Sequence, residues 1–314
     1  MAYNRYSDYL KNKYGCSVYK LPINLPLTCP NRDNNGLGCL FCGESGAGFE
    51  AMPNTMPVIQ QLLANAAKMR EMYKAEKFIA YFQNFTNTYM LPVQFEAYIE
   101  EAASFAGGEI VEIAVSTRPD CIAAPYLDIL KAAREKYGVS ISIELGLQTV
   151  NYHSLAKVNR GHTLAEFIDA VLQIKPYGFD VCVHLILNLP WDNDFDAAET
   201  AKIVSALGVD QVKLHALYVL KDTPLAEQYS SGEIALISKD EYIERVVTFL
   251  EHLSPEIVVQ RIIGRSPLNG SVFSNWSTSW WKIHDAIQEK MAKENRGQGR
   301  LCNYLGGAAV KNFL

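Results

Sequence analysis

Residues 17–42 read SVYKLPINLPLTCPNRDNNGLGCLFC and join an apolar run to three cysteines. The run at 17–25 has the Val, Ile and Leu content of a strand that is buried on both faces. Cys29, Cys39 and Cys42 follow where this strand is expected to end. In α/β barrels, reactive side chains gather just past the carboxyl ends of the strands. The stretch therefore predicts both a buried strand and the place of a functional site.

The same kind of apolar run recurs along the chain, with helical periodicity between successive runs. The further runs cover residues 77–83, 110–117, 139–148, 180–190, 211–220 and 257–264. Strand and helix in alternation predict a parallel sheet with helices outside it. We favour an α/β partial (β/α)6 TIM-like barrel with a short C-terminal helical extension over a doubly wound sheet. The expected domains are a barrel over 1–264 and an extension over 265–314 that packs on it and offers a substrate-binding surface.

Composition limits the class of protein. The chain has 314 residues, 49% of them hydrophobic, and a formal net charge of −5, so it carries no overall attraction for nucleic acid or anionic membranes. The N-terminus is polar, and no run reaches the ~20 apolar residues that span a bilayer. We expect a cytoplasmic protein with no membrane partner, monomeric by default. A local basic end stands out against the net charge: Lys290, Lys293, Arg296, Arg300 and Lys311.

The three cysteines admit two interpretations. Structural zinc sites normally have four ligands, yet one CxxC is present and the next histidine along the chain is His153. Three thiolates also suit a cubane iron–sulfur cluster in which one iron has no protein ligand and can bind S-adenosylmethionine (SAM). From the cysteines alone, the zinc and cluster interpretations have equal support.

Other motifs, taken in order, resemble the radical SAM superfamily over nearly the whole chain. Within it, the chain is most similar to the small YhcC/YtqA-type proteins, near the Elongator catalytic subunit and oxygen-independent coproporphyrinogen oxidase. The motifs are TCPNRD and CLFC within 28–42, YFQNFTNTY (81–89), STRPDC (116–121), ELGLQT (144–149), VNRGHT (158–163), HLILNLP (184–190), TPLAEQY (223–229) and SWWKIHDAIQEK (279–290).

Two departures from the superfamily pattern are visible. The usual cysteine spacing is CxxxCxxC, whereas here the first gap holds nine residues. The extra residues are turn formers, and we expect them to loop out without moving the thiolates. Many members also have a GGE-type turn after the second strand, where this chain has Gln83 and Asn84. We expect the amide groups there to replace the turn in meeting the amino group of SAM.

The resemblance implies a role for each matching position. Cys29, Cys39 and Cys42 would bind a [4Fe–4S] cluster. The implied SAM contacts are Phe41, Gln83, Asn84, Ser116, Glu144, Gln148, Arg160 and His184. The purely structural alternatives to these SAM contacts are a core ion pair between Glu144 and Arg160, helix capping by Ser116, and a structural role for His184. The residues expected to face the substrate are Tyr218, Arg261, Trp280 and Lys282, each of which has a structural role as its alternative.

The implied activity is that of a radical SAM enzyme that cleaves SAM reductively to a 5′-deoxyadenosyl radical, supplied with electrons by flavodoxin or ferredoxin. The expected substrate is tRNA, in which the carboxymethylaminomethyl group at carbon 5 of the wobble uridine would become aminomethyl. The alternatives are a radical SAM enzyme for a small metabolite or porphyrin-like substrate and, further off, a non-enzymatic metal-binding module.

Overall fold

The computed structural model describes residues 2–33, 36–43, 51–267 and 270–313. The chain divides into two compact units. The N-terminal unit comprises Ser7–Gly146 and Arg160–Cys182, and the C-terminal unit comprises Met1–Tyr6, Leu147–Asn159 and Val183–Leu314. The predicted boundary near residue 264 stays a prediction.

The N-terminal unit is built on parallel strands. These are β1 (Val18–Ile23), β2 (Lys77–Phe82), β3 (Ile110–Thr117) and β4 (Ser140–Gln148), whose last two residues belong to the other unit. Each strand pairs in parallel with the next, and the register places Ser116 opposite Glu144. Most of their residues are buried, as their Val, Ile and Phe content predicts.

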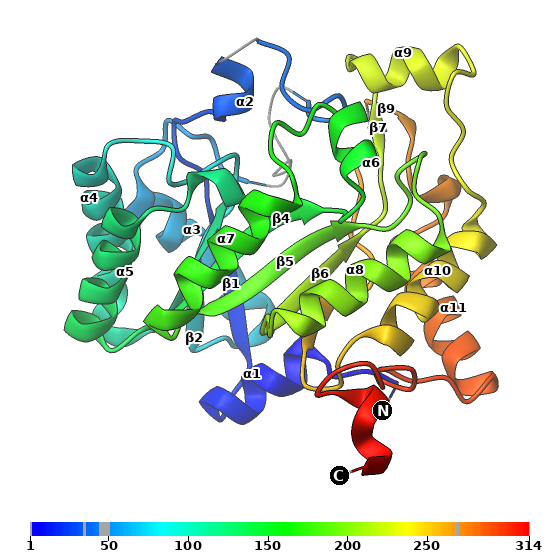
Figure 1. The fold of residues 1–314 in the computed structure, drawn as a ribbon. Coiled ribbons are helices and arrows are strands. Elements are labelled where there is room, and N and C mark those ends of the chain that lie inside the picture. Colours follow the sequence, from blue (N-terminus) through cyan, green and yellow to red (C-terminus); the bar gives the residue numbers. More distant parts are fainter. Residues whose placement is uncertain (1, 34–35, 44–50, 268–269, 314) are drawn as a thin grey trace. The chain divides into compact units, whose positions relative to one another are not determined.

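Helices of this unit follow or precede the strands (Figure 1). They are α1 (Tyr6–Tyr14), α2 (Pro30–Asp33), α3 (Val58–Tyr73), α4 (Pro92–Ala103), α5 (Ala124–Tyr137) and α7 (Leu164–Ile174). Short 3-10 turns cover Phe105–Gly108, Pro119–Cys121 and Lys175–Tyr177. Helix α4 packs against α5, and α5 ends at Gly138, whose φ of 67° suits a residue without a side chain.

The C-terminal unit contains the later strands and helices. They are α6 (Tyr152–Lys157), β5 (Asp180–Ile186, whose first residues belong to the N-terminal unit), α8 (Asp194–Ala206), β6 (Gln211–His215), β7 (Val219–Leu220), α9 (Pro224–Ser230), α10 (Lys239–His252), β8 (Val258–Arg261), β9 (Ser271–Phe273) and α11 (Trp280–Lys293). Short 3-10 turns cover Asn275–Ser277 and Ala308–Phe313. Helix α10 packs against α8 and α11, and β7 pairs antiparallel with β9.

One sheet of seven strands has the order β1-β2-β3-β4-β5-β6-β8. Every predicted apolar run contributes a strand to it, although the run at 211–220 also contains the separate strand β7. The fold is an α/β partial TIM-like barrel, as predicted. Helices α1, α2, α6 and α9 were not predicted, because they are short and lack a long apolar stripe. Within the described ranges, no helix has the length and apolarity that crossing a membrane requires.

Candidate functional site

The segment that carries the cysteines is folded back on itself. Cys29 precedes α2, and the amide of Arg32 donates to the Cys29 carbonyl at 2.8 Å. The Arg32 guanidinium then reaches across the loop to the carbonyls of Cys42 (3.3 Å) and Gly43 (2.9 Å). The extra residues therefore do not simply loop out. Part of them forms a helical turn, α2, whose Arg32 side chain holds the backbone at the third cysteine.

The three thiols share one electrostatic environment. The pKa of Cys42 is raised to about 11, first by burial and then by the neighbouring Cys39 and Cys29 thiols, while Arg32 and Arg160 act in the opposite direction. In the described part of the chain, the three sulfurs do not all lie within 4.8 Å of one another.

Nearly buried donors point at the cysteine sulfurs. Arg160 Nη1 lies 3.4 Å from Cys39 Sγ, Asn31 Nδ2 lies 3.7 Å from the same sulfur, and Arg118 Nη1 lies 3.9 Å from Cys29 Sγ. All three donors are less than 9% exposed. Cationic and N–H groups favour thiolate over thiol, so this donor set suits sulfur ligands of a metal cluster.

The VNRGHT motif packs directly on the cysteine segment. A Cβ on Gly161 would lie 2.3 Å from Asn31 Oδ1 and 3.1 Å from Arg118 Nη2, and the φ of Gly161 is +75°. Arg160 also donates to the Gly146 carbonyl at 2.7 Å, which ties the motif to the end of β4. Glycine is therefore required both by backbone conformation and by close approach.

Next to Gly161, His162 is buried and lies 3.2 Å from the Gly146 carbonyl. Its pKa is lowered to about 4, first by burial and then by the charges of Arg160 and Arg118. The imidazole is therefore neutral at physiological pH.

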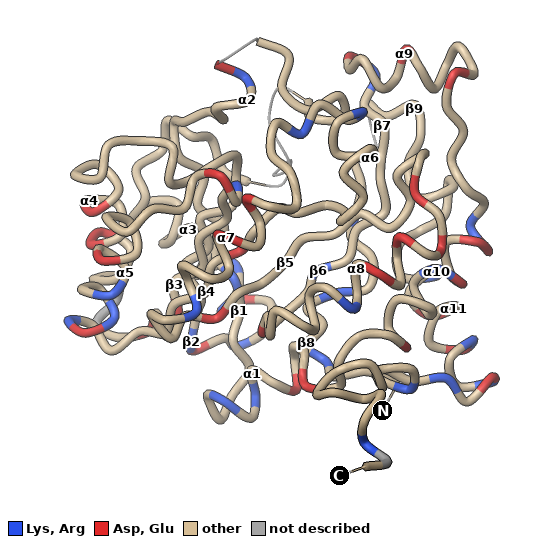
Figure 2. Tube along the Cα trace, in the orientation of Figure 1, with Lys and Arg blue, Asp and Glu red and all other residues tan. Residues whose placement is uncertain are grey.

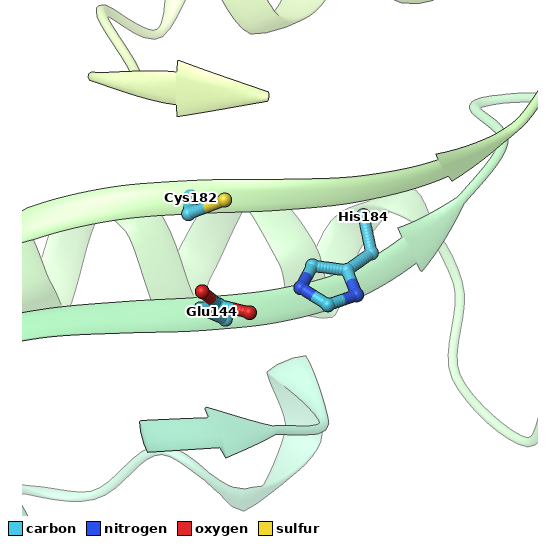
Figure 3. Close-up of side chains that lie close together, drawn as sticks. All are labelled: Glu144, Cys182 and His184. Carbon is cyan, nitrogen blue, oxygen red and sulfur yellow. The ribbon is translucent and has the colours of Figure 1, made fainter. Parts of the chain in front are cut away.

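Polar side chains line one face of β1, β3 and β4. Glu144 is buried and forms an ion pair with Lys20, and its other oxygen accepts from Ser116 Oγ at 3.5 Å. Ser116 also donates to the Tyr81 hydroxyl at 3.1 Å. Figure 3 shows Cys182 beside Glu144, with His184 two residues further along the same strand. Glu144 thus has a lysine partner, rather than the Arg160 partner that the core-pair alternative supposed.

The segment after β2 offers buried oxygen acceptors. Asn84 Oδ1, Thr86 Oγ1 and Asn87 Oδ1 are buried and have no hydrogen-bond partner among the described residues. The Asn84 amide nitrogen is occupied, since it donates to Asn24 Oδ1 at 2.9 Å. Gln83 is half-buried, and its backbone amide donates to the Ile23 carbonyl. Acceptors left without donors in a buried site suit an ammonium group of a ligand.

Two more of the expected SAM contacts, Phe41 and Gln148, lie at the cysteine turn and at the end of β4. Phe41 is half-buried in the turn before Cys42. Gln148, at the end of β4, has a φ of 77°, a backbone conformation that is uncommon for a residue with a side chain and that clusters at functional sites.

In the C-terminal unit, the predicted residues form separate groups. His184 stacks on His215 with ring centroids 5.3 Å apart, and Arg261 Nη2 lies 2.7 Å from His215 Nδ1. Tyr218 is half-buried between β6 and β7. His184 on β5 and Arg261 on β8 thus both contact the imidazole of His215 on β6.

The aromatic residues around the start of α11 differ in exposure. The Arg265 guanidinium carbon lies over the Trp280 ring, 5.9 Å from the ring centroid. Lys282 is exposed and lies over the Trp281 ring at 5.5 Å, and Trp281 itself is 50% exposed. Trp276 instead donates from its indole to the Ile237 carbonyl at 2.8 Å, which marks it as an anchor of the loop.

Residue-by-residue reasoning missed several members of the site. Asn31, Arg118, Asp120 and Gly161 lie inside the quoted motifs, but no role was assigned to them. A buried arginine beside an acidic residue in STRPDC, and a glycine after arginine in VNRGHT, were the available signals. Their contacts with the cysteines are tertiary and leave no mark in local periodicity.

Comparison with known proteins agrees with this geometry. The model of the Radical SAM superfamily matches residues 24–204, and that of the Radical_SAM C-terminal domain matches residues 209–293. The uncharacterized protein YtqA of Bacillus subtilis is 35% identical over 301 residues, which cover 94% of this chain and 90% of YtqA. The tRNA uridine(34) acetyltransferase of Methanocaldococcus jannaschii is 28% identical over 152 residues, covering 47% of this chain and 27% of that protein.

Among solved structures, Methanocaldococcus infernus Elp3 with an N-terminal deletion shares the fold, with a TM-score of 0.69 at 18% identity. The match covers 90% of this chain and 64% of that one. The family-model match spans more than half of the chain, and YtqA is similar along nearly its full length. This chain belongs to the radical SAM superfamily, and it is a radical SAM enzyme whose cofactors are a [4Fe–4S] cluster and SAM.

Proposed function

We propose that Cys29, Cys39 and Cys42 bind the cluster and that the N-terminal unit holds SAM beside it. When bound and reduced, these cofactors supply a 5′-deoxyadenosyl radical that abstracts a hydrogen atom from the substrate. The role of the protein residues is to bind SAM and to orient it beside the cluster. The acceptors after β2 would receive the SAM ammonium group. Arg160 would supply positive charge for its carboxylate, because its buried Nε has no hydrogen-bond partner among the described residues.

The proposed substrate is tRNA, with the carboxymethylaminomethyl group at carbon 5 of the wobble uridine converted to aminomethyl. One observation carries this proposal: about half of the chain is similar to a protein named as a tRNA uridine(34) acetyltransferase. A similarity that covers 27% of that protein supports a shared class of substrate and leaves its acetyl transfer aside. A low-potential donor such as flavodoxin or ferredoxin would supply the electron.

The conversion balances with SAM and water as co-reactants. A hydrogen atom leaves the carbon between the amine and the carboxylate, one electron returns from that carbon, and water then cleaves its bond to nitrogen. One SAM and one water are consumed. Methionine, 5′-deoxyadenosine, glyoxylate and a proton are released with the aminomethyl product. Glyoxylate should therefore form in equal amount with 5′-deoxyadenosine.

The C-terminal basic residues support tRNA binding less than their sequence suggests. Arg296 is paired with Glu244, Glu251 and Glu294, and Arg300 is paired with Glu251. Lys290 is likewise paired with Glu244 and Glu294. Figure 2 shows acidic and basic positions intermixed around α10 and α11.

The exposed aromatic and cationic pair at the start of α11 is the better candidate for contact with RNA. Trp281 is half-exposed and Lys282 lies over its ring, so a base could stack on the indole while the ammonium meets a phosphate.

The test uses anaerobically reconstituted protein with SAM, dithionite and bulk tRNA from a strain that lacks the gene. Mass spectrometry would follow 5′-deoxyadenosine, glyoxylate and the digested nucleosides together, with Cys42→Ala as the control. A tRNA-dependent rise in deoxyadenosine with a changed wobble uridine is expected. Deoxyadenosine without a nucleoside change would overturn the tRNA substrate and favour a small metabolite or porphyrin-like substrate.

A further inference from the structure

Arg118 is a buried cation held in a fixed orientation. Its Nε and Nη2 donate to the two carboxylate oxygens of Asp120 at 2.9 and 2.8 Å, a bidentate pair. The Arg118 side chain is 4% exposed, whereas the Asp120 side chain is 26% exposed. Paired, planar hydrogen bonds of this kind fix the guanidinium plane as well as its position.

The remaining nitrogen of Arg118 faces the cysteine segment. Nη1 donates to the Arg160 carbonyl at 2.8 Å and lies 3.9 Å from Cys29 Sγ. The same side chain thus touches one cysteine sulfur and fixes the backbone of Arg160, whose own guanidinium lies 3.4 Å from Cys39 Sγ. Two of the three sulfurs therefore depend on Arg118, one directly and one through Arg160.

We propose that Arg118, oriented by Asp120, is a positioning residue that acts through Cys29 and Arg160 to raise the reduction potential of the cluster. This inference rests on the cysteine ligand set proposed above. One-electron reduction adds a negative charge to the cluster. A nearby buried cation and N–H donors to sulfur stabilise that charge, and hydrogen bonds to the sulfurs are among the known determinants of cluster potentials.

The test is a redox titration of the loaded protein, followed by the electron paramagnetic resonance signal of the reduced cluster. Arg118→Gln removes the charge and the bidentate pair. At an ambient potential near the wild-type midpoint, the ratio of reduced to oxidised cluster should fall about tenfold, which corresponds to 59 mV for a one-electron couple. An unchanged midpoint with full iron content would overturn the proposal.

Arg134→Gln is the matched control, because Arg134 belongs to the same unit but donates to the Tyr177 carbonyl and lies over Phe179. Its midpoint should equal that of the wild type. If Arg118→Gln binds no cluster, Arg118→Lys takes its place and should give a smaller shift in the same direction. A wild-type midpoint in the lysine variant, or loss of the cluster from both variants, would overturn the redox role in favour of a structural one.

Iron analysis separates this failure from failure of the proposed function. Wild-type protein that binds no iron and sulfide after reconstitution would overturn the ligand set itself. Wild-type protein with a full cluster and an unshifted Arg118→Gln midpoint would overturn the role of Arg118 alone.

Discussion

In the cysteine region of the N-terminal unit, arginines are buried and directed at sulfur, whereas at the C-terminal end of the chain arginines are paired with glutamates. Arg160 and Arg118 lie within 3.9 Å of cysteine sulfurs. Arg296 and Arg300 share the buried carboxylate of Glu251. In the first arrangement Arg118 has one carboxylate partner, Asp120, and both arginines still face sulfur. In the second, the arginines are paired with glutamates and hold α10 and the C-terminal segment together. The number of basic residues in a segment therefore does not tell whether they face a ligand site or are paired with carboxylates.

The largest effect should come from the cysteine region. Cys42→Ala removes one of three proposed ligands, and a cluster held by two thiolates should not persist. Iron and sulfide should fall to background, and formation of 5′-deoxyadenosine should be lost. Cys16→Ala is the control, since Cys16 lies before β1 and outside the motif. Equal iron content in the two variants would contradict the ligand assignment.

The contact between VNRGHT and the cysteine segment can be tested with a pair of glycines. Gly161→Ala and Gly138→Ala both put a side chain at positive φ, which costs about 1–2 kcal/mol. The added Cβ meets nothing within 4 Å at Gly138 but collides with Asn31 at Gly161.

Chemical denaturation should therefore show a larger loss of unfolding free energy for Gly161→Ala, together with reduced cluster loading. Gly138→Ala should load the cluster normally. Equal losses and equal loading would mean that Gly161 does not fix the cysteine segment.

The stability of the protein should depend on pH through His162, which lies in the same VNRGHT motif. Because the pKa of His162 falls from 6.5 to about 4 on folding, the unfolded chain binds the proton and the folded chain does not between these values. Stability of the cluster-free protein should then decrease as pH falls through this window, by up to about 1.4 kcal/mol per pH unit from this group.

His162→Gln should remove that contribution. Denaturation of both proteins at pH 7, 6 and 5 measures the difference in slope, and other titrating groups cancel in the comparison. Parallel stability profiles would contradict a buried neutral His162.

The smallest effect should distinguish paired from exposed groups at the C-terminal end. Trp281→Ala should weaken tRNA binding by about 1 kcal/mol if a base stacks on the exposed ring. Arg300→Gln should change affinity little, because that arginine is already paired with Glu251. Binding measured by filter retention at two salt concentrations would rank the two variants, and the reverse ranking would contradict the assignment.

Much of the fold could be predicted because buried strands leave a strong local signal. The runs at 110–117 and 139–148 are apolar enough to identify β3 and β4 within a residue. Helix α2 could not be predicted, since four residues that include proline and asparagine have no helical period. Its side chains determine its role, and those contacts are made with segments distant in sequence.

The site could be predicted only where a local motif marks its residues. The cysteines were identified from type and spacing, but the pairing of Arg296 with Glu251 joins residues 45 positions apart and is invisible to composition. The same holds for Arg118 and Cys29, which are 89 positions apart. Charge counts along the sequence therefore overestimated the basic surface and overlooked the buried cations.

The most direct test of the account is the electron paramagnetic resonance spectrum of the reconstituted, dithionite-reduced protein with and without SAM, alongside metal analysis. Three cysteine ligands and an open iron predict about four irons and a matching amount of sulfide per chain. They also predict a cluster signal that changes shape when SAM is added. Zinc without iron or sulfide, or a cluster signal indifferent to SAM, would contradict it.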